Sequence, residues 1–278
     1  MRGLLGTISA AVALGAAAAA SAAPSIEIDN AVMQVIVSPE ARRDIAIEIV
    51  RSNPRMPFRA WTFLGRTYID GGFAHRIQGC GLVSGQPAAL VWGLGTVPLS
   101  AMPKIVIHTP LDSRISAGGA VWGDVGRSVS LQLGNAGCGA WSVGEVRGML
   151  RISDAGSGAA RAGQAGSAEL YVAGSGGVSV GPVAGAVTAM DVGAGDIDVA
   201  AVNGPFKVRI AGSGQVRAAS GRVSLMQASI AGSGAVAFNG VVDQLRAQIM
   251  GSGDVRVARV TGQISKVIMG SGRVRVGS

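Results

Sequence analysis

The 278-residue chain predicts an all-β fold, a single-stranded right-handed parallel β-helix (β-solenoid) built from rungs of about 19 residues. Three observations predict it: a glycine corner recurs at a fixed period, alternating strands follow each corner, and apolar residues align in columns when rungs are stacked. A fixed period near 20 residues is typical of solenoids, in which each repeat buries its apolar side against its neighbours. Right-handed winding is the hand that parallel crossovers prefer.

The recurring corner is a glycine–x–glycine element, most often Gly-Ser-Gly. Its first glycines lie 18 to 20 residues apart, at Gly118, Gly137, Gly156, Gly174, Gly193, Gly212, Gly232, Gly251 and Gly270. Sharp corners need glycine because they require a positive φ or a close approach of two backbones. We expect the hydroxyl of the middle serine to satisfy backbone groups at the corner.

The strands after each corner alternate apolar and polar residues, as in Val255-Arg256-Val257, so the valines are expected inward and the arginine outward. Four residues after each first glycine the predicted column is Trp122, Trp141, Ala160, Val178, Ile197, Val216, Val236, Val255 and Val274. A second column, two residues before it, holds Val172, Ile210, Ile230, Ile249 and Ile268, with Asp191 as the exception. Such columns predict a continuous apolar core.

The chain divides into three predicted segments. Residues 1–22 are typical of a signal peptide, with Arg2 before a run of small and apolar residues and Ala20-Ser21-Ala22 as the cleavage site. Residues 23–110 contain β-type sequence without the period and predict an N-terminal β cap with early coils; residues 111–278 predict the regular solenoid. No later stretch is long and apolar enough to span a bilayer, so we expect an exported protein.

The two cysteines, Cys80 and Cys138, predict a disulfide, because exported proteins mature in an oxidising compartment. In a regular solenoid their 58-residue separation, close to three rungs, would place them about 14 Å apart. A disulfide needs Cα atoms within about 7 Å. The bridge is therefore compatible only with a segment 24–110 that departs from the 19-residue register.

The G-S-G-x-V-x-V rungs behind a signal peptide resemble the GIN domain, a family described as the head of autotransporter adhesins. The resemblance extends over roughly residues 118–278 and is weaker over 24–110. It implies a β-helix in the cell envelope of a Gram-negative bacterium, in the periplasm or at the outer surface. It supplies no catalytic residues to transfer to this chain.

Motifs that could carry catalysis or bind a metal are weak. The G-x-S-x-G match at residues 177–181 lacks the following helix and the histidine partner of a hydrolase, and the roles of His75 and His108 stay open. Asp198 could serve calcium only with further oxygen ligands, and its neighbour in the next rung is Arg217. We expect no catalytic residue, cofactor or metal. The alternative is a carbohydrate-active lyase or hydrolase on the same scaffold, which requires a cleft that gathers two or more carboxylates.

Positive charge is confined to one end of the chain. Residues 201–278 contain ten basic and two acidic residues, whereas the remaining residues contain 14 of each. Arg217, Arg256 and Arg275 share one outward column, and together with Arg209 and Arg273 they form the predicted surface for an anionic partner. A purely solubilising surface is the alternative. Nucleic acid is not expected, because aromatic residues for base stacking are missing from this face.

The predicted function is therefore that of an exported, non-enzymatic, adhesin-like binding or scaffold surface of the cell envelope. Its expected partners are acidic polysaccharide, lipopolysaccharide or lipid head groups. End-to-end self-association through the C-terminal rung is a further predicted contact. The charged outward face of Arg273-Val274-Arg275-Val276 counts against it, because charged edges discourage the addition of strands.

Overall fold

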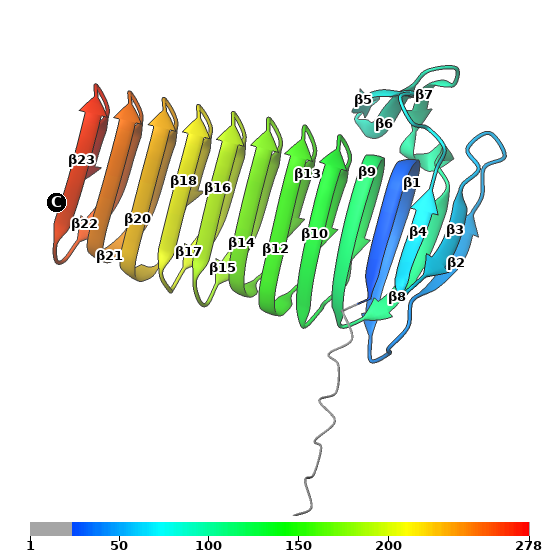
Figure 1. The fold of residues 1–278 in the computed structure, drawn as a ribbon, viewed down its shortest axis with the longest axis horizontal. Coiled ribbons are helices and arrows are strands. Elements are labelled where there is room, and N and C mark those ends of the chain that lie inside the picture. Colours follow the sequence, from blue (N-terminus) through cyan, green and yellow to red (C-terminus); the bar gives the residue numbers. More distant parts are fainter. Residues whose placement is uncertain (1–23, 278) are drawn as a thin grey trace, which may run out of the picture.

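The computed structural model describes residues 24–277, so the predicted signal peptide, residues 1–22, lies outside the described residues. The chain forms a rod of stacked β-coils with a group of antiparallel strands at its N-terminal end (Figure 1). The predicted fold class, a parallel β-solenoid with an irregular N-terminal cap, is confirmed. Within residues 24–277, no helix is long and apolar enough to cross a membrane.

The strands that stack in parallel make up the rod. They are β1 (Ser25–Glu40), β8 (Lys104–Pro110), β9 (Asp112–Val125), β10 (Ser130–Gly137), β11 (Ala140–Val143), β12 (Val146–Gly156), β13 (Ala159–Ala162), β14 (Ala165–Gly174), β15 (Gly177–Val183), β16 (Val187–Gly193), β17 (Asp196–Val202), β18 (Phe206–Gly212), β19 (Gln215–Ala218), β20 (Arg222–Gly232), β21 (Ala235–Gly251), β22 (Asp254–Val260), β23 (Ile264–Gly270) and β24 (Arg273–Val276). Each strand pairs mainly with the equivalent strand of the next rung, so β16 lies beside β18 and β17 beside β19.

The glycine corners are stacked as the period predicts. Gly174, Gly193, Gly212 and Gly232 are consecutive partners, and each has a positive φ between 124° and 144°. The middle serines are exposed, and among the described residues their hydroxyls make no hydrogen bond. The expectation that these hydroxyls satisfy the corner is wrong, because backbone N–H groups, such as that of Ser213 to Gly193 O at 2.8 Å, already satisfy it.

The predicted apolar column is confirmed from Trp141 to Val274, and its members as far as Val255 are buried. Its first member is a correction. Gly119, not Gly118, pairs with Gly137, so Gly123 rather than Trp122 stands in the column beside Trp141. The physical reason is volume: a Cβ at Gly123 would lie 2.2 Å from the Trp141 ring, which already fills that level of the core.

The N-terminal end is a cap built on an extra coil. β1 stacks in parallel on β9, for example Ile26 on Ile115, and on its other side it pairs with β8 and with β4 (Arg66–Asp70). Two outer strands are antiparallel: β2 (Ala46–Arg51) on β8 and β3 (Arg59–Phe63) on β4. These antiparallel additions seal one end of the core, as solenoids require.

A separate three-stranded sheet lies beside the corners at this end of the rod (Figure 1). It contains β5 (Ile77–Val83), β6 (Gln86–Val91) and β7 (Gly95–Pro98), and a short 3₁₀ helix η1 (Leu99–Ala101) follows it. Cys80 on β5 and Cys138 are joined in a disulfide with a Cα–Cα distance of 5.5 Å. Cys138 occupies the middle position of a corner, where six other rungs have serine. The bridge forms because Cys80 belongs to an antiparallel sheet outside the 19-residue register.

Reduction should release this sheet without melting the rod. A second apolar cluster, with Phe73, Ala89 and Met102 in its core, is small compared with the core of the solenoid. We expect non-reducing mass spectrometry to show Cys80 linked to Cys138, and limited proteolysis after reduction to cut within residues 77–98 first. Cleavage that begins equally in the solenoid strands would contradict a local role for the disulfide.

Candidate functional site

The outward column that follows the corners contains the arginines predicted to bind anions. In successive rungs it runs Arg161, Ser179, Asp198, Arg217, Ala237, Arg256 and Arg275. Arg256 and Arg275 are therefore neighbours in adjacent rungs, about 4.8 Å apart along the sheet. Both are exposed, and among the described residues neither has a carboxylate partner.

Arg217 differs from these two arginines because acidic residues hold it. Its guanidinium lies 3.5 Å from Asp198 and 3.7 Å from Asp196, and it also donates a hydrogen bond to the side chain of Gln215. Ala237 separates it from Arg256 by one rung. The structure therefore places Arg217 in the predicted column, with much of its charge compensated locally.

Arg273 lies in the neighbouring outward column, where it follows Asp254, and Arg209 lies on the other side of the glycine corner, on β18. The five predicted arginines are thus distributed over two faces of the rod. Arg209 borders a hollow of about 290 Å³ that contains two further cations, Lys207 and Arg246. The sequence analysis did not group these three residues, although the period of the repeat could have done so.

The hollow beside Arg217 has a volume of about 490 Å³. Its polar lining includes Arg161, Ser179 and Asp198, and Asp198 is its single carboxylate. Ser179, the serine of the G-x-S-x-G match, lies in strand β15, and no histidine borders this hollow. The arrangement does not provide the pair of facing carboxylates that hydrolysis of a glycosidic bond requires.

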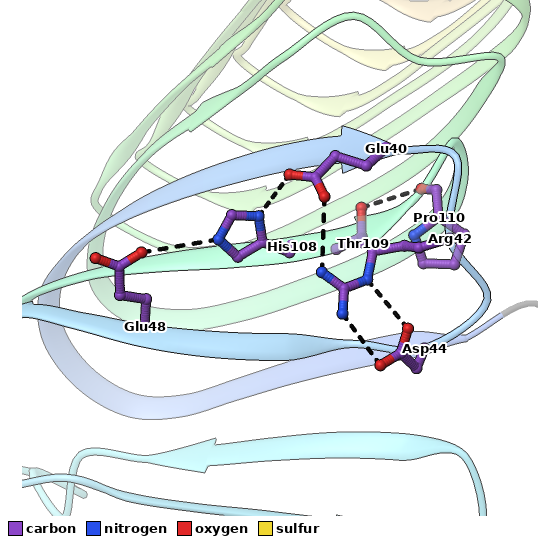
Figure 2. Close-up of polar contacts among 7 residues, drawn as sticks. All are labelled: Glu40, Arg42, Asp44, Glu48, His108, Thr109 and Pro110. Atoms are coloured by element: carbon purple, nitrogen blue, oxygen red, sulfur yellow. Dashed lines mark hydrogen bonds and ion pairs between the residues drawn. The ribbon is translucent and has the colours of Figure 1, made fainter.

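A polar cluster that the sequence analysis missed lies in the cap (Figure 2). His108 on β8 stands between two glutamates: its Nδ1 is 2.5 Å from Glu40 Oε1, and its Nε2 is 3.8 Å from Glu48 Oε2. Arg42 lies 3.6 Å from Glu40 and binds Asp44 through two hydrogen bonds. The hydrogen bond with His108 lowers the pKa of Glu40, and that with Arg42 lowers the pKa of Asp44.

The contacts of His108 connect β8 to the neighbouring strands β1, through Glu40, and β2, through Glu48. The side chains of Glu40 and Glu48 are 42% and 67% exposed, so the cluster lies open to water. No group of three or more histidine, cysteine or acidic side chains suited to a metal occurs among residues 24–277. His75, the other histidine, is exposed at a turn with a φ of 59°. Neither histidine lines a hollow described above.

Two aspartates are buried inside the rod. Asp154 and Asp191 are fully buried and stand, with Asn135, in the column two residues before the corner glycines. Asn135 donates a 2.6 Å hydrogen bond to Asp154 Oδ1. Burial raises the pKa of both carboxyls above the ordinary value of 3.8, and the Asn135 hydrogen bond and the Gly195 N–H offset this only in part.

Comparison with known proteins identifies a similar fold over most of the chain and a family match over its C-terminal part. No curated protein sequence matches the chain. A crystal structure described as a "Putative lipid binding protein" from Parabacteroides distasonis aligns with a TM-score of 0.61 and 18% identity, over 93% of this chain and 94% of that one. At this identity the likeness shows the shared fold. Residues 186–278, which include the basic segment 201–278, match the family described as "Putative auto-transporter adhesin, head GIN domain", and this match confirms the resemblance predicted from the repeats.

Proposed function

We propose that this protein is an exported, non-enzymatic binding module of the bacterial envelope, and that its basic C-terminal rungs attach it to anionic polysaccharide, lipopolysaccharide or lipid head groups. The separation of charge along the rod carries this proposal. Residues 201–278 contain ten basic and two acidic residues. Among the described residues, only Arg217 and Arg222 of those ten pair with a carboxylate. Unpaired like charges on a rigid surface raise the local potential and attract anions.

The comparisons support a binding role in general terms. The family description names the head of an adhesin, and the structural neighbour is described as a lipid-binding protein. Export is supported by the signal-peptide pattern of residues 1–22 and by the Cys80–Cys138 disulfide, which is typical of oxidising compartments. The choice between periplasm and outer surface depends on which anionic partner binds.

Self-association through the last rung is the less favoured contact. The inward column that holds Ala228 and Ala247 continues to Lys266 in that rung. A second copy stacked there would bury the Lys266 ammonium, and an inward-pointing charge is a known protection of exposed sheet edges. Arg273 and Arg275 add like charge to the same edge.

The test is binding to vesicles. We expect the purified mature protein to bind phosphatidylcholine vesicles that contain phosphatidylglycerol and not vesicles of phosphatidylcholine alone. Binding should weaken steeply as salt rises, since exposed charges act within a Debye length of about 8 Å at physiological ionic strength. The double variant Arg256→Asp, Arg275→Asp should lose most of this binding, because it reverses two adjacent unpaired charges.

The matched control is Arg127→Asp, Arg147→Asp, which changes the net charge equally on exposed residues outside the basic rungs. It should retain most of the binding. Equal losses in the two double variants would mean that total charge, and not the basic end, governs binding. Wild-type protein that binds both vesicle types equally at low salt would refute the proposal.

A further inference from the structure

We propose that Lys207, Arg209 and Arg246 form a binding site for a single phosphomonoester group, on the side of the corner opposite to the Arg256–Arg275 column. This inference rests on the proposed function, because it names one anionic group and the residues that recognise it. The three cations border one hollow of about 290 Å³ between β18, β20 and β21. Val208 and Ala228, from the same strands, complete its floor together with the polar residues described next.

The register of three adjacent rungs fixes the arrangement. Lys207, Gln227 and Arg246 stand in one outward column, and Arg209, Ser229 and Gln248 stand in the next. Lys207 and Arg246 are two rungs apart, about 9.6 Å, and Arg209 lies two residues along the strand from Lys207, about 6.6 Å. Gln227 and Ser229, from the rung between Lys207 and Arg246, border the same hollow as the three cations and add neutral hydrogen-bond donors to it.

No carboxylate competes for these cations within the described part of the chain. None of the three takes part in an ion pair. Asp243, the acidic residue nearest in sequence, is held by Arg222 at 3.1 Å and by Thr261 at 3.0 Å. Glu169, two rungs before Lys207 in the same column, is held by Arg151 at 2.7 Å. The three cations of this hollow therefore have no carboxylate partner among the described residues, whereas Arg217 in the other hollow is paired with Asp198.

The size and charge of the site favour a phosphomonoester over other anions. A phosphomonoester carries about −1.5 to −2 charges at pH 7 and offers three strong acceptor oxygens, one for each cation. A carboxylate or a phosphodiester carries one charge and presents two free oxygens. The cations do not continue as a track along the rod, because Thr188 and Met190 precede them and Ser265 and Val267 follow them in the two columns. A compact site of this kind suits one group better than a long polyanion.

Two sources of the group are distinguished by two experiments on the full mature chain. The soluble arm compares glycerol 3-phosphate with glycerophosphoglycerol, its diester analogue, by calorimetry at constant ionic strength. The membrane arm compares phosphatidylcholine vesicles that contain phosphatidic acid with vesicles that contain enough phosphatidylglycerol to equalise the charge. We expect the monoester to be preferred in both arms if the group itself is recognised, and in the vesicle arm alone if the membrane surface must also contribute.

Arg209→Gln and Arg246→Gln should each weaken phosphomonoester binding by about tenfold, the loss expected for one charge-assisted hydrogen bond. Arg256→Gln, on the other face, is the matched control: it should lower binding of both vesicle types equally and leave the monoester preference unchanged. No preference for the monoester in either arm would overturn this inference, as would an equal effect of the three variants. The proposed function would stand in that case if anionic vesicles still bound, and it would fail separately if they did not.

Discussion

Replacing Gly212 with alanine should lower the free energy of unfolding by about 2–6 kcal/mol, because backbone strain and overpacking each contribute about 1–3 kcal/mol. Gly212 has a φ of 139°, which L-residues rarely adopt. A Cβ there would lie 2.1 Å from Gly193 O in the preceding rung. That oxygen belongs to the stacked backbone and accepts a hydrogen bond from Ser213 N, so it cannot move aside without distorting the corner.

Urea unfolding followed by far-ultraviolet circular dichroism measures this loss. Ser213→Ala is the matched control, since Ser213 is exposed at the middle of the same corner and its side chain makes no hydrogen bond among the described residues. It should unfold within about 0.5 kcal/mol of the wild type. Equal unfolding free energies for the two variants would mean that the corner tolerates side chains and that its glycines do not set the stacking.

The sequence alone predicts the regular part of this fold well, because each rung repeats the same physical demands. Val216, Val236 and Val255 were predicted as one column and are partners in the structure. The register of the first rungs is harder to predict, since two adjacent glycines, Gly118 and Gly119, satisfy the corner pattern equally. Packing of the Trp141 ring against Gly123 decides between them, and that contact has no signal in the period.

The cap could be predicted only as β structure. β1 is a full coil, but at its corner the register with β9 shifts between Ile28 and Ala31, and Ala31 rather than a glycine pairs with the corner glycine Gly119. Asn30, inside this irregular stretch, has a φ of 52°, a conformation that asparagine tolerates better than most residues, so the sequence held only a weak signal of this corner. The cluster around His108 depends on antiparallel pairing of β2 with β8, and pairing between strands distant in sequence cannot be read from a local pattern.

For the candidate sites, too, the repeat predicts which residues are neighbours but not which contacts their side chains make. The 19-residue period correctly places Arg256 beside Arg275, and it also places Asp198 beside Arg217, where the ion pair follows. Whether neighbouring charges attract or compensate depends on side-chain conformation. The sequence shows the column but not the side-chain conformation, so Arg217 was predicted to be free to bind anions although Asp198 pairs with it. The face that contains Arg209 was not singled out, although its positive charges have no carboxylate partner among residues 24–277.

The inward column beneath the corners explains why their third residue is also glycine. A Cβ at Gly214 would lie 1.8 Å from Asp191 Oδ2, and at Gly234 it would lie 2.6 Å from Ile210 Cγ2. Each third glycine thus leaves room for the side chain of the preceding rung. Asp191 stands between Val172 and Ile210 in this column, and neither carboxylate oxygen has a partner with good hydrogen-bond geometry among the described residues.

Asp191→Val should therefore stabilise the protein by about 1–3 kcal/mol at pH 7, the cost of a buried polar group without a partner. The gain should depend on pH. Burial raises the folded-state pKa of Asp191 above the ordinary 3.8, the Gly195 N–H offsets this in part, and the charge of Asp196 adds to it. A raised pKa gives a contribution to stability that is complete below pH 3.8 and is lost as the pH rises through the folded-state pKa.

The difference in unfolding free energy between Asp191→Val and the wild type should accordingly be smallest near pH 3.8 and grow toward neutral pH, before it levels off above the raised pKa. Urea unfolding across this range measures it. Asp191→Asn, which copies Asn135 of the same column, should remove the contribution of Asp191 to the pH dependence while keeping a buried polar group. A constant difference between Asp191→Val and the wild type would show that the pKa of this carboxyl is the same in the folded and unfolded states, and that the rod tolerates its charge.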